Sequence, residues 1–227
     1  MKMTKTKLAK GFTLVELLVV IAIIAALAAL STPVVLKQQK KASLAQGVNN
    51  AKQISYLMKD FEEQNGVYPT VDATDGYGAA ATSDLIFKKF YAAGNWDGDE
   101  EVFYAKTPFT IKPDGDEGAI PATDALCLAP GECGFGYSAG LSSSNNASLP
   151  LVYAPLLTTA AMTFDTQSWG GSGCYLEISG AVKTVGINGV DNQLKVTRAA
   201  AKVNLFDSVA NTDWPAVHAP VYPVPKP

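Results

Sequence analysis

Histidine is nearly absent from this chain, with one residue, His218, among 227. Imidazole titrates near neutral pH and is the commonest metal ligand, so its scarcity argues against His-based metal sites and His-based acid–base catalysis. Only 17% of the residues are charged, and 18 Lys and Arg against 21 Asp and Glu leave a net charge of −3. Because binding to phosphate backbones needs a dense basic surface, nucleic acid is not predicted as a partner.

Recognised catalytic motifs are also missing. Residues 170–174 read GGSGC, which departs from the nucleophile-elbow pattern at its last position. The glycines of residues 134–140 do not have the dinucleotide-binding spacing. We therefore expect a protein that is not an enzyme and that holds no cofactor.

The three cysteines, Cys127, Cys133 and Cys174, do not have the spacing of a zinc site. A domain exported across a membrane can keep a disulfide. A turn at Pro130-Gly131 would bring the first two cysteines together, so we predict a Cys127–Cys133 disulfide. Other pairings, such as Cys133 with Cys174, stay open.

Two acidic loops are candidates for calcium, because closely spaced carboxylates in a turn are ligands for that ion. Asp97 and Asp99 lie in the first loop, and Asp114 and Asp116 lie in the second. Neither loop has the EF-hand pattern. We expect solvated acidic loops and keep calcium as the alternative.

The N-terminus carries a long apolar run. Residues 1–11 hold four lysines and no acid, and residues 12–30 are apolar apart from one charge, Glu16. At about 1.5 Å per residue this run spans roughly 28 Å, close to the hydrocarbon thickness of a bilayer. The basic leader favours a cytoplasmic N-terminus. A secretory signal and a plain membrane anchor are alternatives, but a signal has a shorter apolar core and an anchor leaves Glu16 unexplained.

The carboxylate of Glu16 needs a partner, because a charge inside an apolar span is unfavourable when it is unpaired. Cleavage between Gly11 and Phe12 would create an α-amino group four residues before Glu16. On a neighbouring subunit that amine would neutralise the carboxylate, and the pair would fix the axial register between subunits. The alternative is that Glu16 extends to the headgroup edge of the membrane.

The stretch Gly11-Phe12-Thr13-Leu14-Val15-Glu16, followed by an apolar helix and Pro33, resembles the prepilin signature of type IV pilins and of the pseudopilins of type II secretion systems. The resemblance implies cleavage after Gly11 by a membrane-embedded prepilin peptidase and N-methylation of Phe12. It also implies that Glu16 and Pro33 correspond to the family's assembly glutamate and its helix-interrupting proline.

Downstream of Pro33 the apolar pattern becomes amphipathic. Apolar residues recur at steps of three or four from Leu44 to Phe61, which is typical of a helix with one buried face. Asn65-Gly66 is a stop signal. We predict one helix from about residue 12 to residue 64, with a kink or loosening near Leu30–Pro33.

The remaining chain is predicted to complete an α+β, pilin-like fold, in which the long N-terminal helix packs against an antiparallel β-sheet. The expected divisions are a leader (1–11), a transmembrane or filament-core helix (12–36) and a globular domain (37–227) with loops at 66–150, the sheet at 151–210 and a proline-rich tail at 214–227. Within the domain we expect a helix at 83–91, a strand at 101–109, a hairpin of 174–178 with 182–187 that turns at Gly180, and strands at 194–197 and 203–206.

Together these expectations describe a structural subunit of a type IV pilus-like filament, or fimbrium. A pseudopilin of a type II secretion system is the alternative, and a monomeric membrane-anchored binding domain is a more distant one. The resemblance implies, as partners, further copies of the chain, other pilins or pseudopilins, the prepilin peptidase and an inner-membrane assembly platform. The expected location is the bacterial inner membrane as a single-pass precursor, and then a periplasmic or extracellular filament.

Overall fold

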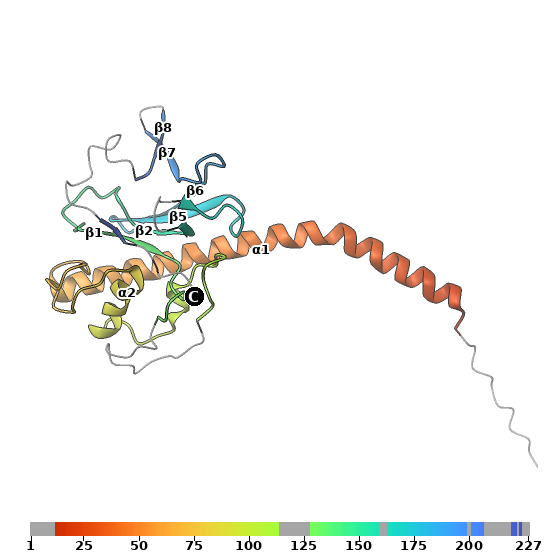
Figure 1. Cartoon of the computed structure of the whole chain (residues 1–227), viewed down its shortest axis with the longest axis horizontal. Coiled ribbons are helices and arrows are strands. Elements are labelled where there is room, and N and C mark those ends of the chain that lie inside the picture. The colour runs from red at the N-terminus through yellow and green to blue at the C-terminus, as the bar shows by residue number, and fades with distance from the viewer. Residues whose placement is uncertain are drawn as a thin grey trace, which may run out of the picture. The chain divides into compact units, whose positions relative to one another are not determined.

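The computed structural model describes residues 12–113, 128–158, 163–198, 201–206, 219–221 and 223. The chain divides into two compact units between Gln39 and Lys40. Helix α1, Leu14–Asn65, begins in the first unit and ends in the second (Figure 1). The predicted helix of residues 12–64 is therefore confirmed to within two residues at its start and one at its end.

Helix α1 runs through Pro33 without interruption. Proline has no N–H to donate to the carbonyl of Ala29, four residues earlier, and two hydroxyl groups of the same turn donate to the neighbouring carbonyl, that of Ala28. Ser31 Oγ lies 3.2 Å and Thr32 Oγ1 lies 2.7 Å from the carbonyl oxygen of Ala28. The expected loosening near Pro33 does not take the form of a break in the helix.

In the second unit, one face of α1 forms part of the main hydrophobic core. The amphipathic spacing predicts this face correctly: Ala51, Ile54, Leu57, Met58 and Phe61 are buried. They pack with α2, Ser83–Ala92, through rings that include Phe87 and Phe90. The predicted helix at 83–91 is thus confirmed, with Thr82 as its N-cap.

Five antiparallel strands form the main sheet, in the order β6-β5-β2-β1-β9. The predicted hairpin is confirmed as β5 and β6, with Gly180 at a φ of +84° in its turn. The tail contributes one edge strand, which pairs with β1. The strand bounds are Gly136–Ala139 for β1, Pro150–Ala154 for β2, Ser172–Glu177 for β5, Val182–Gly186 for β6 and Ala219–Val221 for β9.

A second apolar cluster covers the face of the sheet opposite α1. Alternation along β5 directs Cys174 and Leu176 into the main core and Tyr175 into this second cluster. Figure 1 shows the β7–β8 hairpin on the side of the sheet away from α1. The flanking strands are β3 (Leu156–Thr158), β4 (Thr163–Phe164), β7 (Lys195–Arg198) and β8 (Ala201–Asn204), so the predicted strands at 194–197 and 203–206 are confirmed with small shifts. The predicted α+β class, with a long N-terminal helix and an antiparallel sheet, is confirmed.

Two local predictions are wrong. The expected strand at 101–109 begins instead as a 3-10 helix, η1, Glu100–Phe103, because the Asp99 side chain accepts the Glu101 N–H and starts a helical turn. Strand β1 lies within residues 66–150, where loops are expected from the sequence. Gly136 fits this strand because a Cβ there would lie 2.3 Å from the Tyr153 ring and 2.5 Å from Leu156 Cδ1.

A buried ion pair fixes the loop that follows α1. Lys89 Nζ of α2 lies 2.7 Å from Asp75 Oδ2, and it also donates to the carbonyl oxygens of Thr70 and Asp72. Burial by itself would raise the pKa of Asp75. The hydrogen bonds from Lys89 and from the backbone N–H groups of Thr70 and Tyr77 outweigh burial, and the pKa lies below its ordinary value.

Candidate functional site

The first unit exposes an apolar helical surface. Every described residue from Phe12 to Gln39 is exposed, including large side chains such as Leu14 and Leu30, which are 81% and 75% exposed. A window of 18 residues in α1 has a mean hydropathy of 2.8 and none of it is buried in the chain. By length and composition this segment can cross a membrane, and its surface is satisfied only by lipid or by other apolar helices.

The single carboxylate of the apolar run sits in a capping box at the start of α1. Thr13 precedes the helix, and its N–H and its hydroxyl donate to Glu16 Oε2 at 2.9 and 2.7 Å. In return, Glu16 N–H donates to Thr13 Oγ1 at 3.2 Å. The acidic group also lies in the first helical turn, where the helix dipole favours negative charge.

This capping box changes the sequence-based interpretation of Glu16. Its carboxylate has partners within its own chain, in Thr13, before any neighbouring subunit arrives. The signal was present in the sequence, because Thr-x-x-Glu before an apolar run is the capping-box pattern. Thr13 is therefore the residue of this site that the sequence reasoning missed.

The predicted cleavage junction borders the described residues. Phe12 is 76% exposed, and both Phe12 and Thr13 lie outside the helix, which begins at Leu14. Gly11 and the leader lie outside the described residues. The structure brings Phe12, Thr13 and Glu16 to the same end of α1 and places Pro33 about five turns away along the helix.

Two of the three cysteines are described, and both are buried. Cys133 Sγ donates to the Phe135 carbonyl at 3.4 Å and lies 3.8 Å from Ser83 Oγ. Burial raises the pKa of both thiols, that of Cys174 to about 12, so neither forms a thiolate near neutral pH. No disulfide joins Cys133 to Cys174. Cys127 lies outside the described residues, and its pairing with Cys133 stays a prediction.

The acidic loops are only partly described. Within the described ranges, no three His, Cys, Asp or Glu side chains come together as a metal site. Asp99 holds the first turn of η1 through its hydrogen bond to the Glu101 N–H. Asp114 and Asp116 lie outside the described residues.

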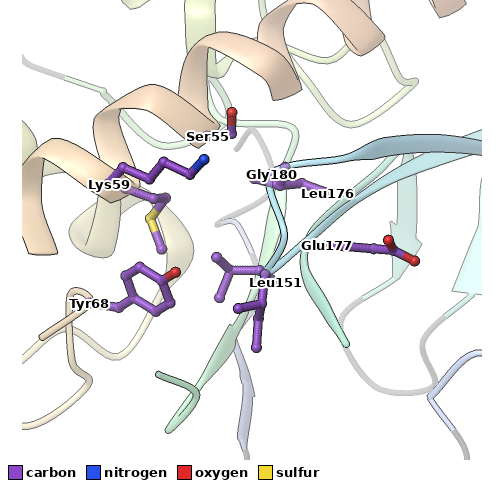
Figure 2. A pocket seen from close by; sticks show the side chains of 9 residues that line it. Ser55, Lys59, Tyr68, Leu151, Leu176, Glu177 and Gly180 are labelled. Atoms are coloured by element: carbon purple, nitrogen blue, oxygen red, sulfur yellow. The ribbon is translucent and has the colours of Figure 1, made fainter. Parts of the chain in front are cut away.

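A small cavity of about 10 Å³ lies between α1 and the hairpin of the main sheet. Figure 2 shows Ser55, Lys59 and Tyr68 on one side and Leu151, Leu176 and Gly180 on the other, with the Glu177 carboxylate directed away. That carboxylate pairs with Lys183 at 2.6 Å. Because this volume is at the lower limit for a single water molecule, the cavity belongs to the core and not to a ligand site.

Comparison with known protein families identifies a motif in the N-terminal segment. The family model described as the prokaryotic N-terminal methylation motif matches residues 6–32. Neither a curated protein nor a solved structure matches the chain. Proteins with this motif are structural subunits that are processed at the N-terminus and assemble with one another. The N-terminal segment of this chain therefore carries the signature shared by type IV pilins and pseudopilins.

Proposed function

We propose that the chain is a structural subunit of a type IV pilus-like filament, made as a precursor, cut after Gly11 and assembled through its N-terminal helix. The observation that carries this proposal is the exposed apolar segment of α1 with Glu16 as its one charge. Such a surface is stable in a bilayer as a monomer and in a bundle of like helices as a polymer. The precursor resides in the inner membrane, and the filament extends into the periplasm or beyond the cell.

Cleavage supplies the second charge that assembly needs. Cutting between Gly11 and Phe12 creates an α-amino group at the exposed end of α1, next to the capping box of Thr13 and Glu16. In the membrane, the Thr13 N–H and hydroxyl satisfy the carboxylate. In the filament, the α-amino group of Phe12 on a neighbouring subunit neutralises the Glu16 carboxylate. This ion pair fixes one axial register between the subunits, which apolar packing alone would not specify.

The test compares filament yield with membrane insertion. Glu16→Ala is expected to leave the subunit in the membrane fraction and to abolish its appearance in sheared surface preparations, measured by immunoblot. Glu63→Ala is the matched control, because Glu63 is an exposed carboxylate on the second half of the same helix. Wild-type amounts of the Glu16→Ala protein in the sheared fraction would disprove the charge pairing.

Cleavage of the leader is measured separately from filament assembly. Gly11→Glu is expected to leave the leader attached, because a bulky charged side chain takes the place of the glycine at the cleavage junction. Intact-mass measurement of the protein recovered from membranes checks this prediction. In the wild type we expect a chain that begins at Phe12 and carries one additional methyl group, and a mature chain with any other start would contradict the proposal.

A further inference from the structure

An open groove of about 320 Å³ lies on the second unit, between α1 and the segment that leads into η1. All of its lining residues belong to the second unit, and none belongs to the apolar segment that the proposed assembly uses. Its polar and aromatic lining residues are Gln46, Asn50 and Gln53 of α1 together with Trp96, Asp99 and Glu101.

The polar walls of the groove are held in place by hydrogen bonds within the chain. Asn50 Nδ2 donates to the carbonyl oxygens of Glu101 and Tyr104 at 2.7 and 3.0 Å. Gln46 Nε2 donates to Glu101 Oε1 at 3.2 Å, and Asp99 accepts the Glu101 N–H. Such pre-organised side chains lose little conformational entropy when a ligand binds.

Trp96 forms the aromatic wall of the groove, and it offers a ligand an apolar ring surface because its N–H is already hydrogen-bonded. The indole N–H of Trp96 is turned toward the carbonyl oxygen of Asp99, at 3.3 Å. The ring lies against the loop backbone, since a Cβ at Gly98 would be 2.6 Å from Trp96 Cζ2. The half-buried ring therefore contributes a rigid apolar surface beside carboxylates and amides.

We propose that this groove binds a pyranose ring of a saccharide. Hydroxyl groups of a sugar both donate and accept hydrogen bonds, which matches a wall of carboxylates that accept and carboxamides that do both. The apolar C–H face of the ring matches the indole surface. The volume is at the small end of the range for ligand sites, which fits one ring and not a larger cofactor.

Two other ligand classes fit less well. An anion would meet the carboxylates of Asp99 and Glu101. A cationic side chain would compete with Lys112, whose Nζ already lies 3.4 Å from Glu101 Oε1, and would meet the donor groups of the amides. A neutral polyhydroxyl ligand has neither conflict.

The test is a titration of the purified full chain in lauryldimethylamine oxide, a detergent without a sugar headgroup. The probes are methyl β-glucoside, methyl β-galactoside, N-acetylglucosamine and maltose, each raised to about 50 mM, well above a millimolar Kd. Saturation-transfer difference NMR reports ring contact, and tryptophan fluorescence reports occupancy. We expect saturable binding of at least one probe. Vesicles that contain galactosyl diacylglycerol, compared with the soluble galactoside, distinguish a glycolipid headgroup from a free saccharide.

Matched variants assign the binding to the groove. Glu101→Gln is expected to weaken binding about tenfold, as for loss of one hydrogen bond to a charged group, and Gln53→Ala about threefold. Glu63→Gln makes the same chemical change on the exposed side of α1 and is expected to have no effect. Failure of every saccharide to saturate, unchanged affinity in both groove variants, or binding of acetyl-lysine amide in place of sugars would each overturn the proposal. Because binding is measured on the detergent-solubilised subunit, these results are independent of whether filaments form.

Discussion

Replacing Gly47 by alanine is expected to destabilise the globular unit, although the same change stabilises most helices. Gly47 is buried in α1, and a Cβ at this position would lie 2.0 Å from Trp169 Cη2 and 2.6 Å from Cζ2. The Trp169 ring is itself 2% exposed, and its N–H donates to the Lys106 carbonyl at 3.1 Å. The indole cannot retreat without giving up that bond.

Two opposing effects decide the magnitude. Alanine gains about 1 kcal/mol over glycine in a helix interior. Overpacking a filled core costs about 1–3 kcal/mol, and loss of the indole hydrogen bond adds about 1 kcal/mol. The net destabilisation is about 2 kcal/mol, and for a domain of this size that lowers the melting temperature by about 4–8 °C.

Thermal unfolding of the detergent-solubilised chain, followed by near-ultraviolet circular dichroism of the tryptophans, measures this change. Gly189→Ala is a control, because a Cβ at Gly189 meets nothing within 4 Å and its φ is not positive. Introducing Gly47→Ala into a Trp169→Leu background removes the clash, so there the alanine is expected to be neutral or stabilising. A Gly47→Ala protein with a wild-type melting temperature would refute the argument from packing.

Two further predictions concern side chains that hold carboxylates. Thr13→Ala is expected to lower the amount of subunit in the membrane fraction, because it removes the hydroxyl that donates to Glu16 Oε2. Thr13→Ser retains a hydroxyl at this position and is expected to restore the wild-type amount. Equal immunoblot signals for the two variants would contradict this role of Thr13. The pKa of Asp75 is lowered in the folded chain, so its ion pair with Lys89 contributes stability above the ordinary carboxyl pKa of about 4 and loses it as the pH falls below that value. Urea unfolding at pH 7 and pH 3 is expected to show a smaller acid-induced loss for Asp75→Asn than for the wild type, and an identical loss would count against the ion pair.

The elements that follow from periodicity are those that the sequence predicts best. The spacing from Leu44 to Phe61 determines both the helix and its buried face, because only a 3.6-residue period puts those side chains on one side. The β5–β6 hairpin follows from two apolar runs around Gly180, whose positive φ suits glycine. The N-terminal signature is equally local, since it depends on contiguous residues from Gly11 to Glu16.

Elements that depend on distant partners are those that the sequence did not reveal. Gly136 belongs to a strand because Tyr153 and Leu156 fill the space above it, and neither lies nearby in the sequence. The groove is equally non-local, since it joins α1 to residues about fifty positions later. The strand expected at 101–109 was wrong because one side-chain hydrogen bond, from the Glu101 N–H to Asp99, outweighed a short apolar pattern.

Both edge strands of the main sheet, β6 and β9, have features that disfavour pairing with a strand of another molecule. Strand β9 contains Pro220, which has no backbone N–H to offer an incoming strand. Strand β6 carries Lys183, whose side chain is 52% exposed while it pairs with Glu177, and a strand added at this edge would have to bury that polar side chain. In the proposed filament, where neighbouring subunits lie close together, these features disfavour edge-to-edge pairing of the globular domains and leave the apolar N-terminal helices as the route of assembly.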